Sequence, residues 1–388
     1  MMYSHTSSWL NEHKRAFFEM SEAIWEHPET AFQEKFALQA QCKLLNELGF
    51  TTESNVFGLE TAYKAVSGNG KSPCVAFAAE YDALPEIGHA CGHNLIAMTS
   101  IAAFAAANSV LTAKGIDGKL VLLGTPGEES AGGKVKMLSN GCLDDVDMVL
   151  TAHPSFRTTP DTGSTGIRRF TVEFHGHSAH AAVSPELGLN ALDAVMLLFN
   201  GINAWRQQLP ENARIHGIVL KGGVVPNIIP DYASCRFFLR STDEKVLDGL
   251  EKRFHDIVKG AELMTGTTAV VTPFKAPYQS RKANTPLNER FIRYAREAGL
   301  NPQIPQSPDR GSSDFGNFSR KRPGIHPYFA ISSDKVIAFH SVEFREAANT
   351  GFARENALKT AAVLASIALD YLSDHDFREA VRQNFDQN

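Results

Sequence analysis

Cysteine is scarce in this sequence, with five residues in a chain of 388. They stand at positions 42, 74, 91, 142 and 235, an odd number without regular spacing. A secreted fold that depends on disulfides usually carries an even set of closely spaced cysteines. We therefore expect reduced thiols and a cytoplasmic protein.

The sequence also lacks a large excess of either charge. It has 38 Lys and Arg against 43 Asp and Glu, which leaves a formal net charge of −5. Proteins that bind nucleic acid or an anionic membrane carry a basic surface. We therefore expect neither of these partners.

We expect neither a targeting segment nor a membrane span. The first residues, MMYSHTSSWLNEHKR, are polar and do not form the apolar core of a signal peptide. The uncharged stretch 95–113 comes close to the ~20 predominantly apolar residues that a span needs. It contains serine, threonine and asparagine, and much of it is alanine, so we expect a buried helix of a soluble protein.

The length of the chain predicts two domains, because a domain typically takes about 100–200 residues. Its hydrophobic content of 43% and charged content of 21% are ordinary for a globular protein with a sizeable core. Helices are expected near 8–26, with Ser7 or Ser8 as N-cap, and near 32–48, 287–297 and 356–372.

One polar stretch, EYDALPEIGHACGHN at 80–94, stands out. An uncharged run typical of a strand buried on both faces precedes it, and an apolar helix-forming run follows it. Chemistry often lies on such loops at the ends of a buried sheet. Cys91 and His93 within it could supply the thiolate and imidazole ligands of a metal ion.

Ionisable residues follow three apolar strands, expected at 74–82, 119–125 and 148–152. Asp82 ends the first strand, Glu128 and Glu129 follow the second, and His153 follows the third. Helices between the strands imply a parallel sheet, and ligands bind beyond the carboxyl ends of such strands. These side chains are therefore expected to converge.

The pattern changes near Gly166. Alternating strands are expected near 168–177, 216–223, 231–241 and 267–274, with amphipathic helices at 184–208 and 243–266. This describes an α+β insert at 166–277. Residues 1–165 and 278–388 would form an α/β catalytic domain with a largely parallel central sheet flanked by helices.

Each of these features alone has an ordinary reading. A lone buried cysteine is usually a packing residue, and His153 and His340 are each more often hydrogen-bonded structural histidines. Cys91 could also be a nucleophile, since ACGH places an imidazole nearby. Together the residues supply one thiolate, three imidazoles and one or two carboxylates, which is enough for two cations.

The chain resembles the aminoacylase/carboxypeptidase family of dinuclear metallo-amidohydrolases. It is most similar to the branch of indole-acetyl-amino-acid hydrolases, aminobenzoyl-glutamate hydrolases and acyl-dipeptide hydrolases. The resemblance covers nearly the whole chain and rests on the motifs EYDALP, GHACGHN, TPGEES, TAHP, GHSAHAA, VVPNIIPD and GSSDFG. It implies a hydrolase-like catalytic fold and an inserted lid and dimerisation domain.

The resemblance implies a role for each motif residue. Cys91 would bridge two metals, His93 and His153 would bind one of them, and Glu129 and His340 the other. Glu128 would be the general base that takes a proton from the metal-bridging water. Asp82 would orient a ligand.

In the lid, His180 matches the histidine that reaches a partner subunit's active site and stabilises the oxyanion. Asn227 and Arg240 match residues that hold the substrate's carbonyl and carboxylate. The resemblance therefore implies a homodimer formed through the lid.

The sequence departs from the family at several places. Glu80 stands where many relatives have a histidine, and Asn94 where this branch usually has aspartate. GSSDFGNFSRKRPGIHPYF also differs, and resembles the acyl-dipeptide hydrolases. Because of these departures, the sequence does not identify the substrate or the metal. Thiolate and imidazole ligands favour zinc, while manganese, cobalt or nickel could bind to the same ligands.

The sequence thus predicts a metal-dependent amidohydrolase or metallopeptidase. Its expected substrates are N-acyl amino acids, aminobenzoyl-glutamate-like conjugates or small dipeptides with a free carboxylate. A dipeptidase or carboxypeptidase of the same mechanism is the nearest alternative. Two further alternatives are a catalytically silent binding or regulatory relative and a cysteine hydrolase that uses Cys91. The cysteine hydrolase lacks the oriented base that its chemistry needs.

Overall fold

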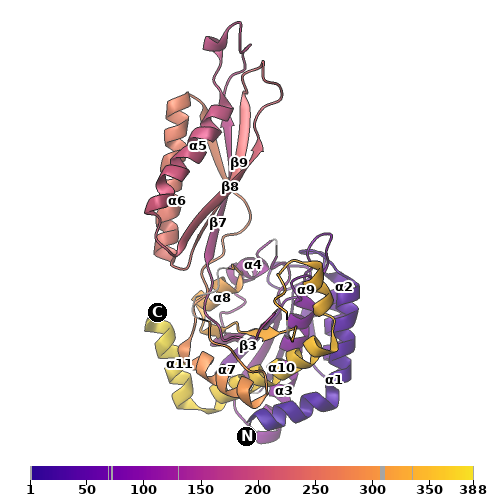
Figure 1. Cartoon of the computed structure of the whole chain (residues 1–388). Helices are drawn as coiled ribbons and strands as arrows, with labels where there is room; N and C mark the ends of the chain where they lie inside the picture. The colour runs from indigo at the N-terminus through magenta and orange to yellow at the C-terminus, as the bar shows by residue number, and fades with distance from the viewer. Residues whose placement is uncertain are drawn as a thin grey trace. The chain divides into compact units, whose positions relative to one another are not determined.

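The computed structural model describes residues 2–68, 70, 73–129, 131–305, 311–333 and 335–387. The chain divides into two compact units (Figure 1). The first unit comprises Met1–Gly163, Arg281–Asp309 and Ser313–Asn388, and the second comprises Ser164–Ser280 and Arg310–Ser312.

A largely parallel sheet lies at the centre of the first unit. Its strands have the order β1-β2-β4-β3-β5-β11. Their bounds are β1 Thr52–Ser54, β2 Tyr63–Gly68, β3 Cys74–Ala79, β4 Lys119–Gly124, β5 Met148–Leu150 and β11 Gly324–Ile325. β3 pairs in parallel with both β4 and β5, and β11 pairs in parallel with β5, whereas β1 and β2 form an antiparallel edge. The predicted fold class is confirmed.

β3 is buried on both faces, as its uncharged sequence predicts. Phe77 and its neighbours on that face belong to the larger core cluster, which contains α3. Ala76 and Ala78 on the other face belong to a second cluster, which contains Phe315. A charged side chain within this strand would be buried without water on either face.

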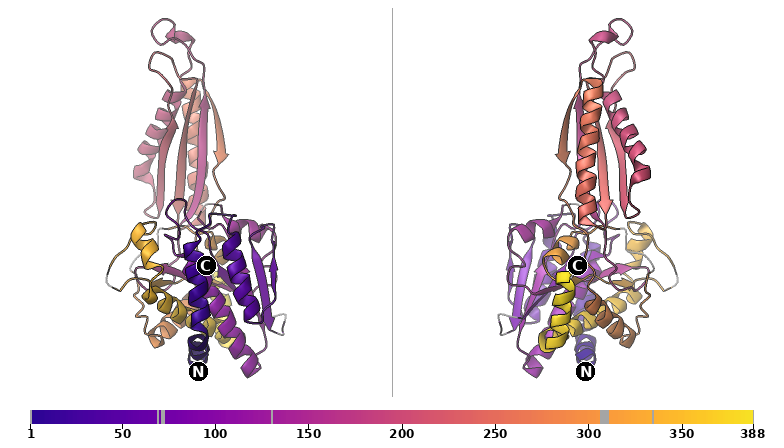
Figure 2. Two further views of the ribbon diagram at one scale, coloured as in Figure 1. Left: turned by 90° about the vertical axis from the view of Figure 1, so that its right-hand side faces the viewer. Right: turned by 90° about the vertical axis from the view of Figure 1, so that its left-hand side faces the viewer.

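Helices cover both faces of this sheet (Figures 1 and 2). The larger core cluster joins it to α1 Met2–Glu26, α2 Lys35–Glu47, α3 His93–Lys114, α7 Thr285–Glu297, α10 Gly351–Ser373 and α11 His375–Gln387. The second cluster joins it to α4 Gly133–Ser139 and α8 Phe315–Lys321. Ser7 and Ser8 lie inside α1 and not at its N-cap, which corrects the expected start. Thr6, one residue earlier, is buried and its hydroxyl lies 3.2 Å from that of Ser366 in α10.

Short elements complete the first unit. β6 His153–Ser155 pairs in parallel with β12 Tyr328–Ala330, and α9 Val342–Ala347 follows the loop that carries His340. β6 begins at the expected ligand His153, so this small sheet fixes the backbone of that residue.

α3 is, among the described residues, the helix that is long and apolar enough to cross a bilayer. However, 83% of its most apolar window is buried inside the fold, where it packs against α1 and α10. The expectation of a buried core helix is therefore confirmed.

The second unit is an antiparallel sheet with two helices on one face (Figures 1 and 2). The strands have the order β10-β7-β9-β8, with bounds β7 Gly166–His175, β8 Ala213–Lys221, β9 Tyr232–Ser241 and β10 Thr268–Pro273. The helices are α5 Ala191–Trp205 and α6 Glu244–Thr265, with short 3-10 turns at Pro185–Leu187 and Arg206–Gln208. Asn190 and Asp243 cap the two helices. The α+β character predicted for the insert is confirmed.

Candidate metal centre

The centre begins where β3 ends. Asp82 is buried, and its Oδ1 lies 2.9 Å from Nδ1 of His93. Its Oδ2 accepts a hydrogen bond of 2.9 Å from the backbone N–H of Glu129. One carboxylate therefore fixes the ring of His93 and the backbone of the loop after β4. This leaves Nε2 of His93 as the nitrogen that can bind a cation.

Nε2 of His93 faces two carboxylates. It lies 3.6 Å from Oε2 of Glu80 and 3.8 Å from Oε1 of Glu129, and makes no hydrogen bond among the described residues. Burial alone would lower the pKa of His93, but Asp82 and the other carboxylates outweigh it and raise the pKa to about 10. A buried nitrogen surrounded by oxygens in this way suits a cation.

Cys91 and His153 form the next pair, with Sγ 3.5 Å from Nε2. Nδ1 of His153 lies 2.7 Å from the carbonyl of Pro154, so Nε2 directs its lone pair at the sulfur. Burial lowers the pKa of His153 to about 4, and burial together with nearby Glu129 raises the pKa of the Cys91 thiol well above its usual range. An imidazole thus faces the thiol, as a cysteine hydrolase would require. The pair is nevertheless neutral, and a neutral thiol is a poor nucleophile.

Glu129 and His340 form the third pair. Oε1 of Glu129 lies 3.3 Å from Nε2 of His340, whose side chain is 51% exposed. The backbone of His340 has φ +62, a left-handed conformation that is uncommon outside glycine. Its N–H donates a hydrogen bond to the carbonyl of Ala90, which fixes His340 beside the Cys91 turn.

The potential ligand atoms fall into overlapping groups, within each of which they lie no more than 4.8 Å apart. Cys91 with His93 and His153 forms one group, and Cys91 with Glu129 and His340 forms another. These groups have the composition of the two predicted ligand sets, with Cys91 common to both. Thiol and imidazole donors, with a buried Nε2 that lacks a hydrogen bond, fit borderline divalent cations.

Glu128 lies in a third such group, with His93 and Glu129. Burial, and next the charges of Glu129 and Glu80, raise the pKa of its carboxyl well above the usual range. A carboxyl with a raised pKa in a polar cluster is suited to taking up and returning protons.

The structure also brings two residues to this centre to which the sequence argument gave no role. Lys134 and Asp314 are fully buried and form an ion pair next to Glu80. Asp314 lies in the GSSDFG motif, so the sequence did contain a signal that could have pointed to this residue. Lys134 follows AGG in the sequence, where a lysine is typical of an exposed turn.

Two of the expected lid residues lie side by side in the second unit, and one does not. His180 and Ile228 form an isolated bridge, and Ala181 N–H donates to the carbonyl of Asn227. Arg240 lies near the other end of β9, about 26 Å from its start at roughly 3.3 Å per residue. Its Nε donates to His216 and its Nη1 to Ser312.

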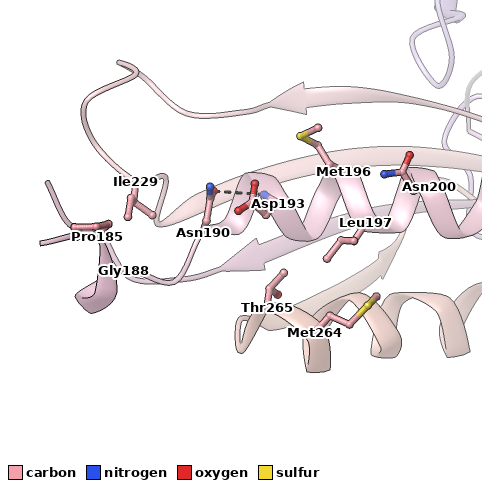
Figure 3. Close-up of a pocket in the computed structure, with 10 residues that line it drawn as sticks. All are labelled: Pro185, Gly188, Asn190, Asp193, Met196, Leu197, Asn200, Ile229, Met264 and Thr265. Atoms are coloured by element: carbon pink, nitrogen blue, oxygen red, sulfur yellow. Dashed lines mark hydrogen bonds between the residues drawn. The ribbon is translucent and has the colours of Figure 1, made fainter. Parts of the chain in front are cut away.

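A cavity of about 590 Å³ also opens in the second unit (Figure 3). The start of α5 and the end of α6 form it together with the turn before α5. Its described lining consists of Pro185, Gly188, Asn190, Asp193, Met196, Leu197, Asn200, Ile229, Met264 and Thr265. This lining includes none of the expected catalytic or substrate-binding residues, so the cavity is separate from the candidate site.

Known proteins resemble this chain over most of its length. A family model described as peptidase dimerisation domain matches residues 162–263. The Xaa-Arg dipeptidase of Mus musculus is 35% identical over 384 residues, which cover 94% of this chain and 88% of that protein. One of the p-aminobenzoyl-glutamate hydrolase subunits of Escherichia coli is 34% identical over 286 residues, which cover 69% of this chain and 59% of that protein.

Solved structures share the fold. A dinuclear metal binding peptidase from the M20 family of Bacillus subtilis superposes with a TM-score of 0.69 at 20% identity, over 93% of this chain and 99% of that one. The aminobenzoyl-glutamate utilization protein of Klebsiella pneumoniae gives a TM-score of 0.69 at 19% identity, over 95% and 98%.

Proposed function

This chain belongs to the M20 peptidase family and is a metal-dependent hydrolase of amide bonds. On this premise, we propose that it cleaves small dipeptides or N-acyl amino acids with a free carboxylate. Aminobenzoyl-glutamate-like conjugates are included in this class. Dipeptides come first because the Xaa-Arg dipeptidase of Mus musculus is similar to this chain over nearly its whole length.

The observation that carries the proposal is the arrangement of five potential ligands in two overlapping groups that share Cys91: Cys91 with His93 and His153, and Cys91 with Glu129 and His340. Two divalent cations bound by these ligands would polarise the substrate carbonyl and lower the pKa of a water to roughly 7. Zinc suits a thiolate and imidazoles best, and manganese, cobalt and nickel are the alternatives to be tested.

Two adjacent glutamates divide the work of the centre. Glu129 has its carboxylate beside the imidazoles of His340 and His93, and its backbone is fixed by Asp82. Glu128 is then the general base, which takes the proton of the attacking water and returns it to the leaving amine. A positioned carboxylate contributes about 10²–10⁴-fold to the rate in this role.

The lid residues would bind the substrate. Nδ1 of His180 accepts a hydrogen bond from the N–H of Ala182, so its Nε2 carries the proton and can donate to an oxyanion. Asn227 beside it would hold the carbonyl. Arg240 can hold a carboxylate through its planar fork, with His216 and Ser312 fixing the guanidinium.

A homodimer through the lid is part of the proposal. β8 is an edge strand of the lid sheet, and Ile218, Val219 and Leu220 on it are exposed. An exposed apolar edge is a template for pairing with another strand. The five cysteines are free among the described residues, which supports the reducing cytoplasm as the location.

The test is a hydrolysis screen of dipeptides and N-acyl amino acids with chelator-stripped protein reloaded with each metal in turn. Glu128→Gln is expected to retain the metal and lose about 10²–10⁴-fold in kcat. Glu86→Gln serves as the control, because Glu86 is an exposed carboxylate in the loop between β3 and α3. Persistent turnover in Glu128→Gln would contradict the assigned base.

The same screen separates the other candidates. A cysteine hydrolase would keep its activity in the chelator-stripped protein. A catalytically silent relative would bind the metals and cleave none of the substrates.

A further inference from the structure

A buried ionic network lies beside the candidate metal centre, formed by Glu80, Lys134 and Asp314. The three side chains are 0–1% exposed. Burying charges is costly unless each finds a partner with good geometry. A lysine and two carboxylates with no access to water therefore require a reason for their position.

Lys134 is held at two points by Asp314. Its Nζ donates to Oδ1 of Asp314 at 2.7 Å, and its backbone N–H donates to Oδ2 at 3.0 Å. Asp314 precedes the first residue of α8, and Lys134 is the second residue of α4. Both oxygens of Asp314 are thus engaged, and the ammonium group has little freedom to move.

Glu80 shares this ammonium group through one oxygen. Oε1 lies 2.8 Å from Nζ of Lys134. Oε2 makes no hydrogen bond among the described residues, and it lies 3.6 Å from Nε2 of His93. The second oxygen of Glu80 therefore points at the nitrogen that Asp82 leaves available for a cation.

We propose that Lys134 and Asp314 orient Glu80 so that its Oε2 faces the cation bound by His93, and that this network sets how tightly that cation is held. The inference rests on the proposed metal centre and adds Glu80 to the carboxylates beside it. Glu80 brings negative charge toward the cation, while Lys134 is a positioning residue that acts through Glu80.

The geometry explains why a lysine suits this place. The carboxylates of Glu80, Asp314 and Glu128 lie close enough for each to influence the others' charge. Without an internal cation these groups would repel one another. Lys134 offsets that repulsion at Oε1 of Glu80, which leaves Oε2 as the oxygen near His93.

The test is a zinc titration of the stripped full-length protein by competition with a chromophoric chelator. It yields the stoichiometry and both affinities without any turnover. Glu80→Gln keeps the shape of the side chain and removes its charge, while Lys134 keeps its bond to Asp314. One of the two cations is expected to bind about tenfold more weakly, within the range found when groups behind a ligand are removed.

Two further variants make the test specific. Glu86→Gln removes an exposed carboxylate of the same loop and is expected to bind both cations as the wild type does. Lys134→Met is compared alone and combined with Glu80→Gln. Because Lys134 acts through Glu80, it is expected to change the affinity when Glu80 is present and to add nothing when Glu80 is glutamine.

The inference is overturned if folded Glu80→Gln binds both cations as tightly as the wild type. It is also overturned if Lys134→Met has the same effect in both backgrounds. If Lys134→Met does not fold, Glu80→Gln alone decides the question. A wild-type chain that takes up no zinc would instead overturn the proposed metal centre, and this is seen before any variant is compared.

Discussion

A fixed Nδ1 is common to two of the histidines at the candidate metal centre, His93 and His153. Asp82 holds Nδ1 of His93, and the carbonyl of Pro154 holds Nδ1 of His153. In both rings Nε2 is left to face the neighbouring thiol or carboxylates. This selection of one nitrogen is what a metal ligand requires.

Replacing Asp82 by Asn is therefore expected to weaken metal binding by about 10–100-fold. The carboxylate accepts from both the His93 ring and the Glu129 N–H, whereas an amide offers one oxygen and would turn its NH₂ toward the other donor. Chelator competition measures the effect. Unchanged affinity in a folded variant would show that Asp82 does not orient His93.

Metal uptake is expected to become tighter as the pH rises. Without a cation, the raised pKa values of His93 and Cys91 keep both groups protonated at neutral pH. A cation must displace these protons, and each proton released makes the affinity rise about tenfold per pH unit. Calorimetry in buffers of different ionisation enthalpy counts the protons. Cys91→Ser should release one fewer, and uptake independent of pH between 6 and 8 would contradict this account.

At the scale of the elements, the turn into α3 is closely packed against the loop that carries Pro154. Gly92, between two expected ligands, has φ +73, and a Cβ there would lie 2.6 Å from Cγ of Pro154. Gly115 at the other end of α3 has φ +61 but nothing within 4 Å of a Cβ. The two glycines thus share a backbone conformation and differ in their surroundings.

Gly92→Ala is expected to lower the free energy of unfolding by about 2–5 kcal/mol, because a clash worth about 1–3 kcal/mol adds to a conformational cost of about 1–2 kcal/mol. Gly115→Ala is the matched control, with a cost of about 1–2 kcal/mol from the conformation alone. Denaturant unfolding of the stripped protein measures both. An equal decrease in the free energy of unfolding for both variants would mean that the loop at Pro154 shifts to accommodate the added methyl group at little cost.

At the scale of the whole molecule, the two edges of the lid sheet offer a direct test of assembly. Ile218→Lys combined with Leu220→Lys places charges on the exposed edge strand β8 and is expected to convert the proposed homodimer to a monomer. Val270→Lys on β10, the opposite edge and also exposed, is expected to leave the dimer intact. Sedimentation velocity distinguishes the two states, and a dimer that survives both changes would exclude pairing through β8.

Much of this architecture could be predicted because its signals are local. The apolar runs of β3, β4 and β5 indicated doubly buried strands, and the polar residues after each run indicated where ligands converge. The helices expected from the sequence did not include α11, although its sequence is amphipathic. Short elements such as β6 and α4 carry too few residues to show a period.

The network around Lys134 could not be predicted for a different reason. Its sequence neighbours, AGG and VK, give no sign of burial, and its partners Glu80 and Asp314 are distant in the chain. Such a pairing follows from tertiary structure alone. The roles of His180, Asn227 and Arg240 stay predictions for the proposed assays.

The burial of α3 has a consequence for the synthesis of this protein. α1 leaves the ribosome before α3 and can cover part of it, but α10, which also packs against α3, is translated near the end of the chain. Until then part of a segment with the length and composition of a membrane anchor stays uncovered on the nascent polypeptide. Fragments that stop before α10 are therefore expected to aggregate, which separating soluble from pelleted material would measure.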